Sequence, residues 1–278
     1  DDFAKIPGSP IAYWVSDRVF SVFEKEKKLI DIGEAREGIH TGNTNKYTRC
    51  WNEINNEEVF YRAKSYEDID NNYLAKWIPY NRGGEYIKWY GNFTHLIIFN
   101  KSNRDEMNKL KGHIRPSQHL YFRKGLTWNL ISSSNFGVRY FPESMLFDVS
   151  SHSAFINDEY FLYLLSSMNS KITYMFLKFL NPTLNFSSGV INKLPIIFPK
   201  QESTKQQIDT LTQECIDISK EEWDSRETSW DFTKNELLKH KSDSKLETAY
   251  NNYCQVWSEK FYKLHANEEE LNRLFIDI

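Results

Sequence analysis

The hydrophobic pattern of this chain changes near residue 200, and that change constrains the fold more than any other feature. Before it, short apolar runs alternate with turn residues, as in β-strands, and a few helical stripes lie among them. After it, apolar residues recur three and four positions apart, which is typical of amphipathic helices. We therefore predict a mixed α/β fold. A β-rich lobe with packed helices should span residues 1–200, and an α-helical hairpin or small bundle should span residues 201–278.

The first part contains several apolar runs bounded by turn residues, and each predicts a β-strand. These runs are residues 47–54, 94–99, 117–122, 127–133 and 136–141. A helix is predicted over residues 11–29, because Ser9 can cap it and Pro10 suits its first position. A second helix is predicted over residues 159–180. It is apolar on nearly all sides, so we expect it to be largely buried.

The ends of the predicted helices follow from capping residues. Asn157 or Asp158 can cap the helix over residues 159–180, and Pro182 closes it. In the second part, residues 201–225 carry an apolar stripe that predicts one amphipathic helix. Another long helix begins near residue 246, and Asn267 resembles the cap of a new helical start.

The densest mixture of aromatic and cationic side chains lies in residues 76–92, KWIPYNRGGEYIKWYGN. Arg and Lys neutralise phosphates, aromatic rings stack on bases or wedge between them, and glycines admit a close approach of the backbone. A simpler interpretation is a strand-turn-strand unit whose aromatic rings are buried. Composition alone leaves both interpretations open.

Charge is distributed unevenly along the chain, although the formal net charge is only -3. Residues 1–200 hold 25 Lys and Arg against 21 Asp and Glu, and residues 201–278 hold 10 against 17. Within residues 71–140 the count is 11 against 3, a net charge of +8. A local basic field in a nearly neutral protein suits a polyanion bound at one face. A solvated basic surface is the alternative.

The motifs of several common enzyme chemistries are absent from the sequence. It has no Gly-x-Gly, no GxxxxGK[ST] loop, no GxSxG and no Pro-Asp dipeptide. His113 and His119 lie near each other without further ligands nearby, which argues against a metal site. Cys50, Cys215 and Cys254 are far apart and odd in number, which predicts a reducing cytoplasm and no disulfide framework. No apolar run is long enough to span a membrane.

Five segments of the sequence carry a resemblance to a known family. They are GIHTGNTNKYTRCWNEI, KWIPYNRGGEYIKWYGN, KGLTWNLISSSNFGVRYFP, LLSSMNSKITYMFLKFLNPTLNF and NEEELNRLFIDI. Together they resemble the PglX family, the adenine-specific DNA methyltransferases of BREX phage-defence systems, which are related to single-chain restriction-modification enzymes. The resemblance covers most of the chain in the family's order. It implies the region that follows the methyltransferase domain, where the target recognition domain lies.

Two motifs of that family are missing from this sequence. The methylation motif Asn-Pro-Pro-Tyr/Phe is absent, since the only Asn-Pro is Asn181-Pro182 and Thr183 follows it. The glycine motif that binds the cofactor is absent too. The resemblance therefore implies a fragment that neither binds S-adenosylmethionine nor methylates DNA by itself, the cofactor belonging to the full-length parent. Its implied partners are double-stranded DNA, the missing methyltransferase domain and other subunits of the defence system.

A second resemblance concerns residues 191–211, INKLPIIFPKQESTKQQIDTL. This segment is similar to the end of a recognition domain in type I specificity subunits. That similarity implies that the helix from about Thr204 is a spacer between the recognition lobe and another module.

Candidates for DNA contact come from the cationic, polar and aromatic residues of the first part. Arg82 and Arg139 suit guanine, and Asn81 suits adenine. The candidates for phosphate contact are Lys46, Arg49, Lys76, Lys88, Arg123 and Lys124, and those for adaptable hydrogen bonds are Ser132, Ser133 and Asn135. Thr41 and Asn43 lie in a Gly-flanked loop that suits a close approach to the backbone, and Trp89, Tyr90 and Trp128 are candidates to hold the strand distorted by base flipping. Core packing of the aromatics and solvation of the cations remain alternatives. Glu85 is expected to pair with Arg82 or Lys88. The alternative is that Glu85 accepts a hydrogen bond from a cytosine amino group.

Two functions of different classes follow from these observations. The first is recognition of double-stranded DNA within an adenine-specific methyltransferase. The second is a protein-interaction module, in which the acidic helical tail packs on other defence-complex subunits or the basic face takes an inhibitor that mimics DNA.

Overall fold

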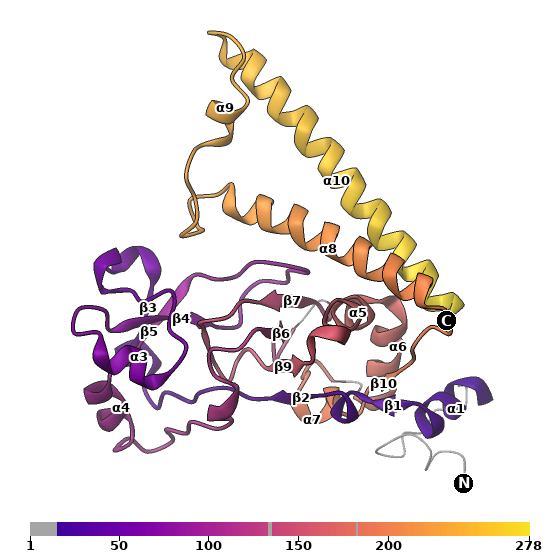
Figure 1. The fold of residues 1–278 in the computed structure, drawn as a ribbon, viewed down its shortest axis with the longest axis horizontal. Coiled ribbons are helices and arrows are strands. Elements are labelled where there is room, and N and C mark those ends of the chain that lie inside the picture. The colour runs from indigo at the N-terminus through magenta and orange to yellow at the C-terminus, as the bar shows by residue number, and fades with distance from the viewer. Residues whose placement is uncertain (1–15, 133–134, 182) are drawn as a thin grey trace.

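The structure is a computed structural model, and it describes residues 16–132, 135–181 and 183–278 (Figure 1). Two four-stranded sheets form the lobe. The first has the order β2-β9-β6-β7 and is antiparallel throughout, and the second has the order β3-β5-β4-β8 with a parallel pair at β4-β8. The strands of the first sheet are β2 (Gly33–Arg36), β9 (Ser153–Ile156), β6 (Gly125–Trp128) and β7 (Val138–Phe141). Those of the second are β3 (Thr48–Cys50), β5 (His95–Ile98), β4 (Trp77–Asn81) and β8 (Leu146–Phe147).

Short elements complete the lobe. A two-stranded antiparallel sheet joins β1 (Lys27–Lys28) to β10 (Pro195–Ile196). The helices of the lobe are α1 (Asp17–Lys25), α2 (Thr44–Tyr47), α3 (Tyr66–Asn71), α4 (Lys101–Met107), α5 (Asp158–Asn169), α6 (Lys171–Leu180) and α7 (Ser188–Ile191). The mixed α/β class predicted from the sequence is confirmed.

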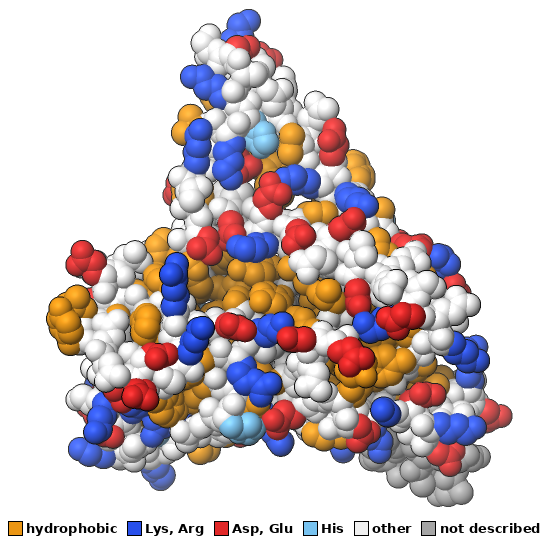
Figure 2. Space-filling view, in the orientation of Figure 1, with side chains coloured by type: hydrophobic (Ala, Val, Ile, Leu, Met, Phe, Trp, Pro, Cys, Tyr) orange, Lys and Arg blue, Asp and Glu red, His pale blue; other side chains and the backbone are white. Residues whose placement is uncertain are grey.

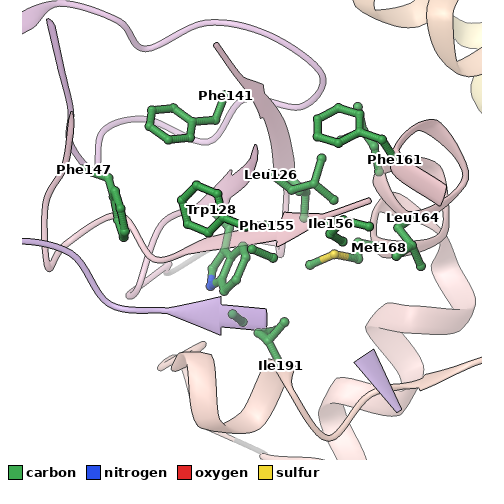
Figure 3. Close-up of a cluster of buried hydrophobic side chains, with 14 of the residues drawn as sticks. Leu126, Trp128, Phe141, Phe147, Phe155, Ile156, Phe161, Leu164, Met168 and Ile191 are labelled. Atoms are coloured by element: carbon green, nitrogen blue, oxygen red, sulfur yellow. The ribbon is translucent and has the colours of Figure 1, made fainter. Parts of the chain in front are cut away.

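The main core lies between the first sheet and α5. Figure 3 shows Leu126 of β6 and Ile156 of β9 close to Phe161 and Met168 of α5, and all four side chains are buried. One cluster of buried apolar residues extends from α1 to the end of α10, so the helices after residue 200 contribute to the same core. Whether residue 200 separates two domains stays a prediction.

Three helices follow residue 201: α8 (Glu202–Asp224), α9 (Glu236–Lys239) and α10 (Leu246–Asp277). Helix α8 packs against α5 and α10, and the two long helices diverge so that one end of α10 projects from the lobe (Figure 1). The amphipathic helix predicted over residues 201–225 is confirmed, with Ile208 and Cys215 fully buried. The new helical start predicted at Asn267 is wrong. Asn267 lies inside the continuous helix α10, and its amide Nδ2 donates to Glu214 Oε2 of α8 at 2.8 Å.

The long helix predicted over residues 159–180 is two helices. Ser170 has an extended conformation, and its hydroxyl accepts a hydrogen bond from the backbone N–H of Thr173 at 3.2 Å. A serine in this position caps the second helix, so the chain turns between α5 and α6. Helix α1 covers part of the helix predicted over residues 11–29, and its predicted cap, Ser9 with Pro10, lies outside the described residues.

The predicted strands had mixed outcomes. Those over residues 94–99 and 136–141 are confirmed as β5 and β7, and that over residues 47–54 is shortened to β3. Residues 117–122 form a single 3₁₀ turn instead of a strand, because Ser117 and Phe122 both have left-handed backbone angles, φ 56° and 66°. The strand predicted over residues 127–133 begins earlier, at Gly125, and ends at Trp128.

None of the described helices is both long and apolar enough to cross a membrane.

Candidate nucleic-acid interface

The aromatic and cationic run, residues 76–92, has two halves with different surroundings. Its first half is β4, in which all five residues are buried. Tyr80 donates its hydroxyl proton to Asp148 Oδ2 at 2.7 Å, and the Asn81 amide donates to two buried hydroxyl groups within 2.8 Å. Burial, reinforced by the Asp148 carboxylate, raises the pKa of Tyr80 well above its ordinary value, so this phenol stays neutral. Asn81, predicted to read adenine, is therefore a core residue in this conformation.

The Gly83-Gly84 pair packs against protein rather than projecting outward. The Gly83 amide donates to Ser150 Oγ at 3.1 Å, and a Cβ at this position would lie 2.8 Å from the Ser150 carbonyl oxygen. Gly84 and Asn129 exchange hydrogen bonds, at 3.3 Å from the Gly84 amide and at 2.7 Å to the Gly84 carbonyl. Close packing within the lobe thus explains the need for glycine at position 83.

The second half of the run is held against the helices after residue 201. Glu268 of α10 accepts from the Trp89 indole N–H at 2.7 Å and from Lys88 Nζ at 3.3 Å. Lys220 of α8 lies over the Tyr90 ring at 5.0 Å, and Trp89 and Tyr90 are 3% and 8% exposed. In this conformation these side chains anchor the helices and do not face solvent.

Much of the +8 charge of residues 71–140 is compensated by carboxylates from outside that segment. The pairs are Arg104–Asp70 at 2.6 Å, Lys124–Asp158 at 2.8 Å, Lys88–Glu268 at 3.3 Å and Arg82–Asp148 at 3.9 Å. The pairing of Glu85 with Arg82 or Lys88, expected from the sequence, is therefore corrected, because both cations have other carboxylates. Burial and local packing decided which acid each cation meets.

An exposed group of lysines remains at the end of the lobe that carries α4. Lys101, Lys109 and Lys111 are exposed there, and Lys46 pairs with Glu106 beside them. We call these four lysines the α4 corner. Figure 2 shows Lys and Arg side chains gathered over this end of the molecule, with acidic side chains between them. Lys101, Lys109 and Lys111 were not among the residues predicted to contact DNA, although their position within the +8 segment was a usable signal.

A loop predicted to contact DNA lies beside the α4 corner. His40 pairs with Ile114 through backbone hydrogen bonds of 2.9 and 3.1 Å. This brings residues 41–46 next to residues 110–113, and Gly42 packs against Leu110. Asn43 is exposed and caps α2 by accepting from the Lys46 amide at 3.1 Å. Asn43 and Lys46 can therefore act together with the exposed lysines.

Several other candidates are dispersed. Thr41 is buried, and Arg49 is half-buried and donates to the backbone carbonyls of Asn45 and Thr48. Lys76 and Arg123 are exposed. Trp128 is fully buried and donates its indole N–H to the Phe186 carbonyl at 2.7 Å, so it belongs to the core in this conformation.

The remaining polar candidates meet at a narrow slot between two loops. We call it the Arg139 slot, and it is lined by Tyr86, Ile87, Asn129, Ser132, Asn135, Phe136, Gly137, Arg139 and Phe186. Asn135 is exposed at this slot, and Arg139 is fully buried. Ser132 donates its hydroxyl proton to the Asn135 carbonyl at 2.9 Å, whereas Ser133 lies outside the described residues.

A separate groove runs between the second half of the run and the helices. It has a volume of about 590 Å³, and its aromatic lining includes Tyr86, Trp223, Trp257 and Phe261. Phe261 is 64% exposed. No group of three His, Cys, Asp or Glu side chains is placed to hold a metal ion within the residues that the structure describes.

These features define a mixed α/β lobe with exposed lysines at the end that carries α4. Helices α8 and α10 pack against the second half of its aromatic and cationic run. No family model matches the chain. The chain is 38% identical over 289 residues to the adenine-specific methyltransferase PglX of Lacticaseibacillus casei (strain Zhang). It is 33% identical over 283 residues to the adenine-specific methyltransferase BrxX of Escherichia coli O9:H4 (strain HS).

Both matches cover 100% of this chain but only 24% and 22% of the relatives, so the chain spans about a quarter of the length of the curated relatives it matches. The resemblance to PglX seen in the sequence is confirmed. Over its whole length, the chain is homologous to one segment of PglX and BrxX.

Proposed function

We propose that this chain recognises double-stranded DNA within an adenine-specific (N6) DNA methyltransferase, whose catalytic domain lies outside these residues. The observation that carries the proposal is the match of the entire chain to two adenine-specific methyltransferases. A methyltransferase that modifies a chosen adenine needs a surface that holds the duplex as well as a catalytic pocket. The sequence has no Asn-Pro-Pro-Tyr/Phe or Gly-x-Gly motif, which favours the recognition role.

The proposed assembly follows from that role. S-adenosylmethionine would be held by the methyltransferase domain of the longer protein, and this chain would supply binding energy and target choice. The α4 corner suits phosphate contact, because exposed lysines release counterions when they neutralise phosphates. Asn43 and Asn135 are exposed polar groups that suit contacts to phosphate or base edges. In this proposal the protein acts in phage defence of the BREX or restriction-modification type.

Titration of a DNA duplex tests the proposal. Binding should be weak and salt-sensitive, because a catalytic domain normally completes the clamp around the duplex. A triple variant at the α4 corner, Lys101→Glu, Lys109→Glu and Lys111→Glu, should weaken binding by at least about tenfold and reduce the salt slope. The matched control is Lys234→Glu, Lys241→Glu and Lys245→Glu, with the same charge change at exposed positions near α9. Equal losses in both variants, or no binding at low salt, would contradict the proposal.

The aromatic groove favours a second function, docking of a protein. Its exposed Phe261 and its half-buried Trp223 and Trp257 provide an apolar surface of the kind that anchors a helix. Another subunit of the defence system would be the partner in this case. A Phe261→Glu variant should then lose the partner in a pull-down while it keeps duplex binding. Loss of duplex binding together with the partner would favour a single shared function.

A further inference from the structure

Arg139 is a buried cation whose hydrogen-bonding capacity is largely unused. It extends from β7 and is 0% exposed, and its Nε and Nη2 atoms have no hydrogen-bond partner among the residues that the structure describes. Its Nη1 makes one long contact of 3.4 Å with Asn129 Oδ1. A buried guanidinium normally satisfies most of its five donors, so the missing partners need an explanation.

The charge of Arg139 is also uncompensated. Among the described residues no carboxylate forms an ion pair with it, and burial alone lowers the pKa of its guanidinium to about 10. The group therefore remains charged at neutral pH. A buried charge without a partner is costly, whereas an anion that reaches it gains both Coulombic energy and directed hydrogen bonds.

The Arg139 slot is closed in this conformation, and the Tyr86 side chain is one of those that line it. Among the residues that the structure describes, the slot leaves no room for a water molecule. The Tyr86 ring lies against Gly137, where an added Cβ would be 2.7 Å from Tyr86 Cε2. Tyr86 is 40% exposed, so rotation of its side chain into solvent is sterically feasible and would uncover the slot.

We propose that the Arg139 slot is an anion site that binds one phosphate group when Tyr86 moves aside. Arg139 supplies the positive charge and paired N–H donors, for which the tetrahedral oxygens of a phosphate are a good geometric match. The Asn135 side chain at the rim can add a neutral donor. The same chemistry occurs in a phosphodiester of DNA and in free phosphate. The identification of the natural ligand as a DNA phosphate rests on the proposed function, but the anion site does not.

Nitrogen-15 labelling of arginine provides a direct readout of the site. The Arg139 Nε–H signal is assigned by its loss in Arg139→Lys, and Arg104→Lys assigns the other buried arginine as an internal control. Inorganic phosphate and a DNA duplex are then titrated separately, with sodium chloride at matched ionic strength as the reference. The Arg139 signal should shift with phosphate and with duplex, while the Arg104 signal stays in place.

Two variants at position 86 test the cover. Tyr86→Ala should lower the phosphate concentration for half-maximal shift by about tenfold, since it removes the ring that the proposal requires to move aside. Tyr86→Phe keeps the ring and should behave as the wild type. Denaturant unfolding of Arg139→Lys, Arg139→Met and both Tyr86 variants shows which are folded. Arg139→Met tests duplex affinity without relying on the signal assignment.

Each outcome decides the matter. A shift with both ligands, or with the duplex alone, supports the site, and the second result identifies a DNA phosphate as the ligand. A shift with phosphate but no duplex binding at any salt concentration supports the anion site while the proposed function fails. The inference is overturned if chloride produces the same shift. It is also overturned if neither ligand shifts Arg139 and Arg139→Met binds duplex with unchanged affinity, which leaves the proposed function standing.

Discussion

Two regions of the lobe each bury a guanidinium group and treat its charge in opposite ways. Arg104 of α4 is 6% exposed, donates to Asp70 Oδ2 at 2.6 Å and to the Phe99 carbonyl at 2.7 Å, and lies over the Tyr66 ring at 4.7 Å. Arg139 of β7 is fully buried, and its one side-chain hydrogen bond within the described residues, from Nη1 to Asn129 Oδ1, is 3.4 Å long. The first charge is satisfied within the protein and the second is not. This difference is the basis of the anion site proposed at Arg139, because an unpaired buried charge is costly and an external anion would compensate it.

The largest expected effect is in the satisfied region. Arg104→Met should destabilise the fold by about 3 kcal/mol, because it breaks a mostly buried ion pair and strands the Asp70 carboxylate. The partial exposure of Asp70, 29%, keeps the loss at the low end of the range for buried pairs. Denaturant unfolding followed by tryptophan fluorescence measures the change. The duplex affinity of Arg104→Met should not change. A loss of affinity would contradict the expectation that Arg139, and not Arg104, contributes to duplex binding.

The corresponding change in the other region should have the opposite sign. Arg139→Met should leave stability unchanged or raise it by up to about 2 kcal/mol, because an apolar side chain replaces an uncompensated buried charge. The slope of the logarithm of duplex affinity against the logarithm of salt concentration should fall by about 1. Unfolding and salt titrations measure both quantities. If Arg139→Met destabilised the fold as much as Arg104→Met does, both arginines would stabilise the fold in the same way, and the contrast between them would be wrong.

A third test concerns Glu268, a carboxylate that lies far along the sequence from the cation with which it pairs. Glu268→Gln removes the charge that α10 supplies to Lys88 and to the Trp89 indole. The expected loss is about 1.5 kcal/mol, the usual scale for hydrogen bonds to a charged group. Amide hydrogen exchange over residues 86–90 should become faster at the same time. Glu269→Gln is the matched control, because its ion pair with Lys171 is exposed and should contribute less than about 0.5 kcal/mol.

The smallest expected effect concerns a buried neutral group. His152 is 4% exposed, and its Nδ1 accepts from the Ser188 amide at 2.8 Å. Burial lowers the pKa of His152. The unfolded chain therefore binds the proton more readily, so the contribution of His152 is complete above about pH 6.5 and is lost as the pH falls below that value.

The loss between pH 7.5 and pH 5.5 should stay below about 1.4 kcal/mol, the limit for one proton bound only in the unfolded state. A His152→Gln variant should lack this part of the pH dependence of unfolding. Identical profiles for the variant and the wild type would show that His152 does not titrate differently in the two states.

The sequence predicted the fold class well and the boundaries of its elements less well. The change of pattern near residue 200 coincides with the point after which the described elements are all helices, whereas a domain boundary there stays a prediction. A helix start was wrongly predicted at Asn267, because asparagine is a common capping residue. Asn267 instead lies inside α10, where its side chain is buried and donates a hydrogen bond to Glu214 of α8. Ser170 was overlooked within an apolar run, yet it caps α6 and breaks the predicted helix. At Asn267 a contact with another helix decided the role of the side chain. At Ser170 the extended backbone conformation of one residue ended a helix that the apolar period alone would continue.

The structure places some of the predicted contact residues at the surface and others in the core. Lys46 and Asn43 lie at an exposed surface, and the neighbouring Lys101, Lys109 and Lys111 were not among the predicted residues although they belong to the basic segment. Asn81, Trp89 and Trp128 have the residue types of DNA contacts but are buried in this conformation. The sequence shows the type of each side chain but does not show whether that side chain faces the solvent or the core.

The sequence by itself determined the class of fold, the basic segment and the relationship to PglX, because these depend on composition, period and order along the chain. Only the tertiary structure decided which cations meet carboxylates. Asp70, Asp148, Asp158 and Glu268 all lie outside residues 71–140, yet folding brings each of them to a cation within that segment. Within the part of the chain that the structure describes, Arg139 is left without such a partner. The physical reason is that a charge is compensated only by groups within a few ångströms, and such proximity is set by packing rather than by distance along the chain.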